Sequence, residues 1–526
     1  MPFTTVDFIV FFAVVFFCYY ALPHRFRWML MLAGSWVFYG WLSPYYLIFL
    51  GFTTVLTYFV AVMMDRDYRQ ERAWIAANGK LVGRDEKKAF RVAMDRKRWR
   101  WSCLAIVLLF SMLVVFKYLE FLFVNVSWLT GAIGLNWKAP SLNLILPIGL
   151  SFYVFQSMAY VIDVQRGEMP AERNIFRHAL YVSYFPQIMQ GPIGNYGRLA
   201  HQLFERHDFN YEQAVFGVQR IAWGFFKKVM IANIIANRID PVWINASNYS
   251  GLIFWGAILF LYAVQLYADF SGYMDIACGC SQMLGIKLDE NFNCPYFSKS
   301  VSEYWRRWHM SLSSWFKDYL FYPVLRSEWN TKIRKRFANK HLAASVPTAI
   351  ALAIVWAATG LWHGASWGYV LWGVYYGLFM IFGVLLSPVY EWWHKFHPGL
   401  TDSRLYVAFQ VSRTFMIVLC GYAIFKPADL SVTVEIVRQG LSGIGLDGIS
   451  RLTHTLHASF WRVLLAMALM FAVDVVHYSR PKGTIRSFVC RLPGALRWSA
   501  YVLGIWLMVF YGLYGAGYQQ FEYFKF

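Results

Sequence analysis

The chain has 526 residues, of which 58% are hydrophobic, 20% aromatic and only 15% charged. This composition excludes an ordinary soluble globular protein and predicts an integral membrane protein. Lysine and arginine exceed aspartate and glutamate by 49 − 29 = 20. Membrane proteins collect such an excess in cytoplasmic loops, so we expect a lipid bilayer and no nucleic acid as its surroundings. Cys278 and Cys280 lack the spacing and the second pair of a zinc site, and no metal site is predicted.

Apolar runs that are long enough to cross a bilayer follow one another along the chain. Residues 6–22 lack the basic start and the cleavage site of a signal peptide, and are interpreted as a retained first span. Residues 28–64 hold 37 positions without a charge, about twice the length of one span, and Ser43-Pro44 divides them into two. The further candidates are residues 102–124, 142–162, 178–196, 212–237, 252–268, 270–286, 346–361, 367–386, 405–425, 461–477 and 498–518.

Two of these segments contain polar residues that a plain span avoids. Pro192 lies in 178–196, and Arg220, Lys227 and Lys228 lie in 212–237, so each segment is predicted to be re-entrant or buried inside the bundle. The total is about 11–13 spanning or re-entrant helices. Because no repeat or linker is found, residues 1–526 are predicted to form a single all-α polytopic domain.

Three basic loops set the orientation. Residues 65–100 hold twelve Lys/Arg against six Asp/Glu, residues 326–340 six against one, and residues 480–497 five against none. All three are expected to be cytoplasmic. The parity of the spans then places both ends of the chain outside.

A histidine in an almost charge-free stretch is the first candidate for chemistry. Residues 341–390 contain no charge other than possible ones on His341 and His363, and His363 lies in a Gly-flanked turn between two spans, Gly360-Leu361-Trp362-His363-Gly364. Imidazole has an unperturbed pKa of ~6.5, so it can accept a hydroxyl proton as that oxygen attacks a thioester or ester carbonyl. The alternative is a histidine that only bonds a neighbouring helix.

A second candidate is the segment 300–320. Ser300 and Glu303 form a capping box, which predicts a helix from Val301. Its apolar positions at helical spacing, which face lipid or core, are Trp305, Trp308, Leu312 and Trp315. Its polar positions on the other surface are Arg306, Arg307, His309 and Lys317. The arginines suit the phosphates of a donor such as coenzyme A, or alternatively anionic lipid head groups.

A third candidate is the pair of intramembrane carboxylates Asp269 and Asp275, predicted to join two apolar runs. Such carboxylates are expensive to bury and face a partner or a water-filled cavity. The expected partner is Arg306 or Arg307. An ion pair that fixes helix packing and a catalytic role for Asp269 are both open.

Five motifs in order resemble one family. They are Leu146-Pro147-Ile148-Gly149-Leu150-Ser151-Phe152-Tyr153, Tyr184-Phe185-Pro186-Gln187 with Gly191-Pro192-Ile193, the Asp269–Asp275 segment, Glu303-x-Trp305-Arg306-Arg307-Trp308-His309 with Ser311-Leu312-Ser313-x-Trp315, and Gly360-Leu361-Trp362-His363-Gly364-Ala365. Together they resemble the membrane-bound O-acyltransferase (MBOAT) family, in its bacterial alginate O-acetyltransferase-like branch. The resemblance covers at least residues 146–373.

The resemblance implies a helical bundle with a central tunnel. His363 matches the family's catalytic histidine and His309 a supporting one. Supporting or donor-binding positions are then Asp269, Arg306, Arg307, Trp305, Trp362 and Ser313. The implied enzyme of the bacterial inner membrane binds no cofactor. It takes an acetyl group from a cytoplasmic thioester, acetyl-CoA, and a partner transferase outside delivers the group to an exopolysaccharide.

One departure leaves the polymer open: Pro323-Val324-Leu325-Arg326 stands where the alginate-type pattern has Pro-Leu-Gly-Gly. Alginate, cellulose, peptidoglycan and other polysaccharides remain acceptors to test, and D-alanyl transfer to teichoic acid is the alternative within the family. A transporter or flippase, and a scaffold of an export complex, are alternatives of other classes.

Overall fold

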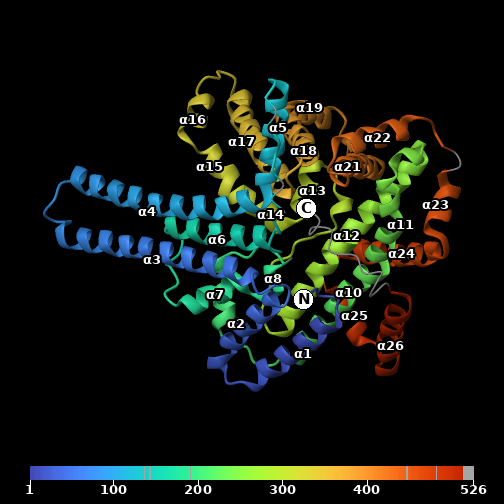
Figure 1. The fold of residues 1–526 in the computed structure, drawn as a ribbon, viewed down its shortest axis with the longest axis horizontal. Coiled ribbons are helices and arrows are strands. Elements are labelled where there is room, and N and C mark those ends of the chain that lie inside the picture. Colours follow the sequence, from blue (N-terminus) through green and yellow to red (C-terminus); the bar gives the residue numbers. More distant parts are fainter. Residues whose placement is uncertain are drawn as a thin grey trace. The chain divides into compact units, whose positions relative to one another are not determined.

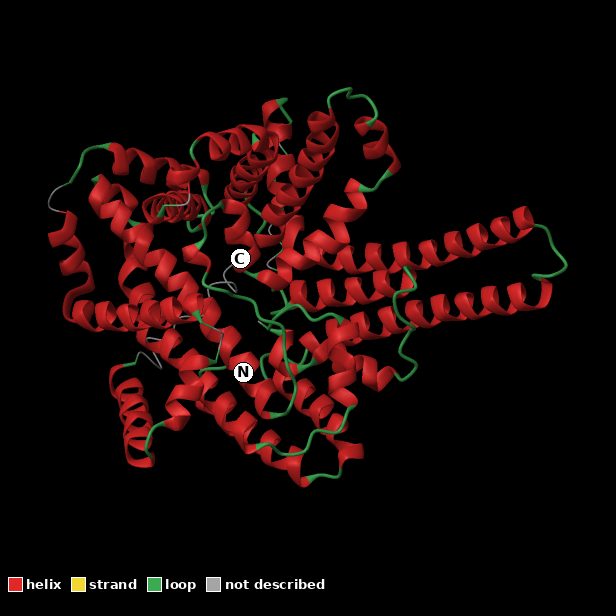
Figure 2. Cartoon of the chain, turned by 180° about the vertical axis from the view of Figure 1, so that it is seen from behind, coloured by secondary structure: helices red, strands yellow, loops and turns green. Residues whose placement is uncertain are grey.

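The structure is a computed structural model. It describes residues 1–135, 137–140, 142, 144–189, 191–401, 403–445, 448–480 and 483–512. Within these ranges the chain consists of helices and loops (Figure 2), apart from one isolated antiparallel bridge between Phe292 and Trp308. The predicted all-α fold is confirmed.

The chain divides into two compact units. Unit 1 comprises Met1–Gly217 and Ala277–Asp289, and unit 2 comprises Val218–Ile276 and Glu290–Phe526. The boundary falls within two helices, because α10 (Tyr211–Phe226) begins in unit 1 and α12 (Leu252–Met283) ends there. Every candidate site residue named from the sequence lies in unit 2.

Unit 1 contains the first nine helices, blue to green in Figure 1. They are α1 (Val6–Ala21), α2 (His24–Gly40), α3 (Tyr46–Asn78), α4 (Arg84–Leu113), α5 (Leu119–Ala132), α6 (Leu150–Gln165), α7 (Ile175–Ser183), α8 (Phe185–Ile188) and α9 (Tyr196–Phe204). The break that Ser43-Pro44 predicts is confirmed, because α2 ends and α3 begins on either side of it. Helices α3 and α4 lie side by side as a long pair (Figure 1), and α6 packs against both.

Ion pairs with one buried member each join α3 and α4 in the charged half of the pair. Lys97 lies 2.6 Å from Asp67, and Arg98 bonds Glu71 at 2.7 Å as well as Asp95. Arg98 is almost fully buried and its guanidinium stacks over the Tyr68 ring. These contacts explain how two strongly polar helix ends stay paired beyond the apolar part of each helix.

Unit 2 contains the remaining helices. They are α11 (Asn233–Ile244), α13 (Val301–Arg307), α14 (Met310–Phe316), α15 (Tyr322–Leu325), α16 (Glu328–Arg334), α17 (Lys340–His363), α18 (Trp367–Leu385), α19 (Ser387–Phe396), α20 (Pro398–Thr401), α21 (Arg404–Phe425), α22 (Leu430–Leu441), α23 (Gly448–Leu456), α24 (Phe460–Ser479), α25 (Thr484–Arg491) and α26 (Gly494–Tyr511), together with most of α12. Helix α18 packs against both α17 and α21.

Two glycines let α17 and α18 approach closely. A Cβ added to Gly360 would lie 3.3 Å from the Cα of Gly373 and 2.5 Å from the carbonyl oxygen of Tyr369. Small residues at such a crossing allow two backbones to pack directly in a membrane. This contact, three residues before His363, fixes the position of the end of α17.

Eight helices among the described residues are long and apolar enough to cross a membrane. They are Tyr46–Asn78, Arg84–Ala132 (α4 continuing into α5), Leu252–Met283, Lys340–His363, Trp367–Leu385, Arg404–Phe425, Phe460–Ser479 and Gly494–Tyr511. Helix α1 is apolar but shorter. The polytopic class is confirmed. The predicted segment 178–196 is divided among shorter helices, whereas 212–237 lies in one continuous helical stretch that runs from α10 through a π-helical turn into α11. Residues 513–518 of the last predicted span lie outside the described residues.

One expectation is wrong: residues 252–268 and 270–286 do not form two spans. They form the single helix α12, and Asp269 and Asp275 lie inside it. The helix continues through Ser271 and Gly272, and the Ser271 hydroxyl donates to the Tyr267 carbonyl one turn earlier. A Cβ on Gly272 would lie 2.9 Å from the Gly224 carbonyl oxygen, so this glycine allows α10 to approach closely.

Candidate active site

His363 is the last residue of α17, at the turn where the sequence predicts it. The turn is short because Ser366 caps the next helix, its hydroxyl accepting from the Tyr369 backbone N–H. The imidazole is buried, and its ring centroid lies 4.7 Å from that of Trp372 and 5.1 Å from that of Phe425. Aromatic rings from α18 and α21 therefore enclose it.

His309 lies in a break that the sequence did not predict. The capping box is confirmed, because Ser300 Oγ accepts from the Glu303 N–H at 3.1 Å and α13 begins at Val301. The helix then ends at Arg307, because Trp308 pairs with Phe292 in the isolated bridge. His309 adopts a left-handed backbone with φ of 46° before α14 begins. That conformation is uncommon for a residue other than glycine, and strained positions of this kind gather at functional sites.

His309 and His363 share Trp362 as a neighbour. The Trp362 ring centroid lies 6.0 Å from that of His309 and 5.0 Å from that of His363. His309 is buried against Phe270 of α12, with its Nδ1 3.2 Å from Asn291 Oδ1. His309 lies outside the eight candidate spans, and burial lowers its pKa to about 3. Its ring is therefore neutral at pH 7.

Further aromatic side chains continue the cluster from His363. The Trp305 ring lies 4.9 Å from Trp356 and from Tyr376, and 5.5 Å from Trp372. Of the apolar positions predicted to face lipid or core, Trp308, Leu312 and Trp315 are buried and Trp305 is half-buried. The buried Nε1 atoms of Trp305 and Trp372 and the Tyr376 hydroxyl have no hydrogen-bond partner among the described residues. Each is a donor that suits an oxygen of a bound substrate.

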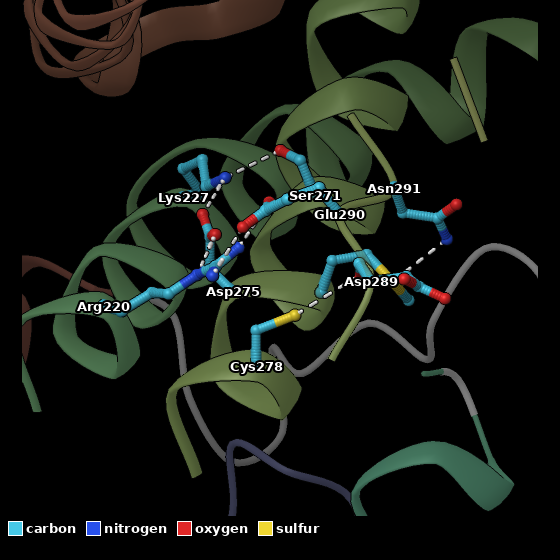
Figure 3. A network of polar contacts seen from close by, with 9 residues as sticks. Arg220, Lys227, Ser271, Asp275, Cys278, Asp289, Glu290 and Asn291 are labelled. Atoms are coloured by element: carbon cyan, nitrogen blue, oxygen red, sulfur yellow. Dashed lines mark hydrogen bonds and ion pairs between the residues drawn. The ribbon is translucent and has the colours of Figure 1, made fainter. Parts of the chain in front are cut away.

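The intramembrane carboxylates pair with lysines, and the predicted pairing with Arg306 or Arg307 is wrong. Lys228 Nζ lies 2.7 Å from Asp269, and Lys227 Nζ lies 2.6 Å from Asp275. Both lysines belong to a π-helical turn, Lys227–Ala232, that follows α10. Figure 3 shows Lys227 also reaching the Ser271 hydroxyl, at 2.8 Å. The pairing favours the packing role left open for Asp269.

Arg220 extends this network along α10. Its Nε donates to Asp275 at 2.9 Å, and its two terminal nitrogens reach the two oxygens of Glu290 at 2.9 and 2.8 Å (Figure 3). A bidentate arginine–carboxylate pair has a fixed geometry. Three cations thus balance three carboxylates within this part of unit 2.

Arg306, Arg307 and Ser313 lie at the edge of the cluster. Arg306 is exposed and donates to Ser302 Oγ at 3.0 Å. Arg307 pairs with Glu303 at 2.7 Å. Ser313 is half-exposed on α14, and its backbone N–H donates to the His309 carbonyl. The exposed Arg306 is free of any ion pair among those described, so it is the better placed of the two arginines to meet an anionic donor.

Several neighbours of these residues could not be predicted from the sequence. Trp372, Tyr376 and Phe425 carry no motif beyond being aromatic, and Asn291 lies in an ordinary polar loop. Lys227 and Lys228 were detectable as charges in an apolar segment, but their partners depend on tertiary packing.

Fold and site together define a polytopic helical membrane protein with two buried histidines that both contact Trp362. The profile of the MBOAT, membrane-bound O-acyltransferase family matches residues 171–422. The chain is 31% identical over 433 residues to a probable alginate O-acetylase AlgI of Pseudomonas aeruginosa, covering 82% of this chain and 73% of that protein. It therefore belongs to the MBOAT family and is an acyltransferase.

Two relatives carry other names. A peptidoglycan O-acetyltransferase of Helicobacter pylori is 28% identical over 384 residues, covering 67% of each chain. A teichoic acid D-alanyltransferase of Bacillus subtilis is 30% identical over 293 residues, covering 55% of this chain and 70% of that protein. The matches confirm the resemblance drawn from the motifs.

Proposed function

We propose that this acyltransferase takes an acetyl group from acetyl-CoA on the cytoplasmic side of a bacterial inner membrane and passes it outward for O-acetylation of a polysaccharide. The observation that best supports this is that His363 and His309 are both buried and both contact Trp362, in an aromatic cluster between apolar helices. The relatives named as an alginate O-acetylase and a peptidoglycan O-acetyltransferase favour acetyl as the group and a glycan as the acceptor.

In the proposed reaction His363 is the general base. It takes the proton of the acceptor hydroxyl as that oxygen attacks the thioester carbonyl carbon; the carbon–sulfur bond then breaks, and His363 returns the proton to the leaving thiolate. Negative charge develops on the carbonyl oxygen, where the N–H groups of Trp305 and Trp372 are candidate donors. Neutral His309 orients the site, and Arg306 meets the phosphates of the donor.

In this proposal a separate periplasmic or extracellular transferase completes delivery to the polysaccharide. The basic segments 65–100, 326–340 and 480–497 lie on the cytoplasmic side, where the donor is available.

The test is transfer of labelled acetyl from acetyl-CoA by protein in lipid vesicles, with the partner transferase and alginate, cellulose or peptidoglycan as acceptors. We expect His363→Ala to lower the rate by ~10²- to 10⁴-fold, and His394→Ala, at an exposed histidine of α19, to leave it unchanged. Full activity of His363→Gln would exclude the general-base role. Transfer from a D-alanyl thioester in place of acetyl-CoA would establish the alternative within the family.

A further inference from the structure

Asn291 is a buried side chain with every polar atom engaged close to His309. It is 1% exposed and lies between Glu290 and the bridged Phe292. Its Oδ1 accepts from the Ser311 backbone N–H at 2.9 Å and from Ser311 Oγ at 3.0 Å. Its Nδ2 donates to the sulfur of Met274 on α12 at 3.2 Å. The side chain is therefore held from three directions.

These contacts decide which way the amide points and which nitrogen of His309 carries hydrogen. A backbone N–H can only donate, so the Asn291 atom that faces Ser311 must be the oxygen. The same oxygen lies 3.2 Å from His309 Nδ1. An oxygen acceptor there is satisfied only if Nδ1 is protonated, and in a neutral imidazole the lone pair then belongs to Nε2.

We propose that Asn291 is a positioning residue that fixes the neutral His309 ring as its Nδ1–H tautomer, so that Nε2 is the nitrogen that accepts a hydrogen bond or a proton in the site. A histidine in an acyltransferase site acts through one nitrogen, and the hydrogen bond made by the other nitrogen selects it. Asn291 supplies that selection here.

The backbone around Asn291 is held on both sides. The Asn291 carbonyl accepts from the Met310 N–H at 3.0 Å, and the Asn293 N–H donates to the Arg307 carbonyl at 3.0 Å, so the segment is tied across the left-handed turn at His309. Glu290, directly before Asn291, accepts hydrogen bonds from both terminal nitrogens of Arg220. Glu290 thereby connects Asn291, the residue that orients His309, to the charged network. This network consists of Arg220, Lys227, Lys228, Asp269, Asp275 and Glu290.

The first experiment reads the tautomer without any activity assay. Solid-state NMR of the full chain in lipid vesicles, with ¹⁵N-labelled histidine, separates protonated from unprotonated ring nitrogens, and comparison with His309→Gln assigns the His309 signals. At pH 7 we expect a protonated Nδ1 and an unprotonated Nε2. A protonated Nε2 with an unprotonated Nδ1, or a doubly protonated ring, would overturn the proposal.

Variants test the role of Asn291 itself. Asn291→Asp keeps an oxygen acceptor and should keep the Nδ1–H signal, whereas Asn291→Ala removes the acceptor and should give a mixture of tautomers. Asn330→Ala is the matched control, since Asn330 is equally buried but bonds the carbonyls of Val324 and Pro347; it should leave the His309 spectrum unchanged. An unchanged spectrum in Asn291→Ala would refute the positioning role.

The activity experiment rests on the proposed function, but failure of this inference can be distinguished from failure of that function. We expect Asn291→Ala to lower kcat about tenfold or more with little change in KM, as for other residues that orient a functional imidazole. If the Nδ1–H tautomer is confirmed but the protein transfers no acetyl, the proposed function is refuted and this inference stands. If transfer depends on His363 but the opposite tautomer is found, the proposed function stands and this inference is refuted.

Discussion

At the scale of single residues, the charged network and the two histidines show that burying an ionisable group is costly unless its charge is compensated or removed. Lys227 and Asp275 lie 2.6 Å apart with little exposure to solvent, and Arg220 completes the neutralisation of the carboxylate. Removing one member of such a group leaves an uncompensated buried charge, which costs far more than the loss of an exposed pair.

Asp275→Asn should therefore destabilise the protein by about 3–5 kcal/mol. The matched control is Asp208→Asn, which breaks the exposed pair with Arg206 and should cost less than about 1 kcal/mol. Thermal unfolding in detergent, followed by tryptophan fluorescence, measures both. Equal losses in the two variants would contradict the burial of the network.

The depressed pKa of His309 makes stability depend on pH. The group titrates near its ordinary value of about 6.5 when unfolded and at about 3 when folded, so between these values the unfolded chain binds a proton that the folded chain does not. Stability from the neutral ring is complete above pH 6.5 and falls as the pH drops toward 3. Between pH 6.5 and 5, wild type should lose about 1–2 kcal/mol more than His309→Gln. Parallel melting curves for the two proteins across this range would contradict the shift.

At the scale of elements, the contact between α17 and α18 sets the position of His363. Gly360→Ala would place a methyl group against the Tyr369 carbonyl and Gly373, and should cost about 1–3 kcal/mol. Because the change shifts the end of α17, transfer activity should fall with it. Gly383→Ala on α18 is the control, since its Cβ meets nothing within 4 Å, and it should be neutral or slightly stabilising. Loss of function in the control alone would refute this account.

The sequence predicts elements well where one local signal decides them. Apolar length delimits α18, and Ser300 with Glu303 marks the start of α13. The sequence does not predict a helix end or a contact that depends on a segment far away in the chain. The end of α13 depends on Phe292, and the partner of Asp269 depends on a lysine in another helix. His363 can be predicted because the sequence around it lacks charge. Asn291 cannot, because only folding brings it next to His309.

At the scale of the whole molecule, the eight candidate spans and the basic loops define an orientation that can be tested. Lys80, in the loop between α3 and α4, and Ser442, after α22, are both exposed and are predicted to lie on opposite sides of the membrane. In intact cells a membrane-impermeant thiol reagent should label Ser442→Cys above the wild-type background and should label Lys80→Cys only after the membrane is opened. The opposite pattern would invert the proposed topology.

The order of the charged network along the chain has a consequence for biosynthesis. Arg220, Lys227 and Lys228 are synthesised before the α12 carboxylates that neutralise them. An apolar helix that carries unpaired cations partitions poorly into lipid. We expect the α10–α11 segment to enter the bilayer only together with α12. In a chain stalled before Asp269, this segment should therefore remain accessible to protease although the earlier spans are inserted.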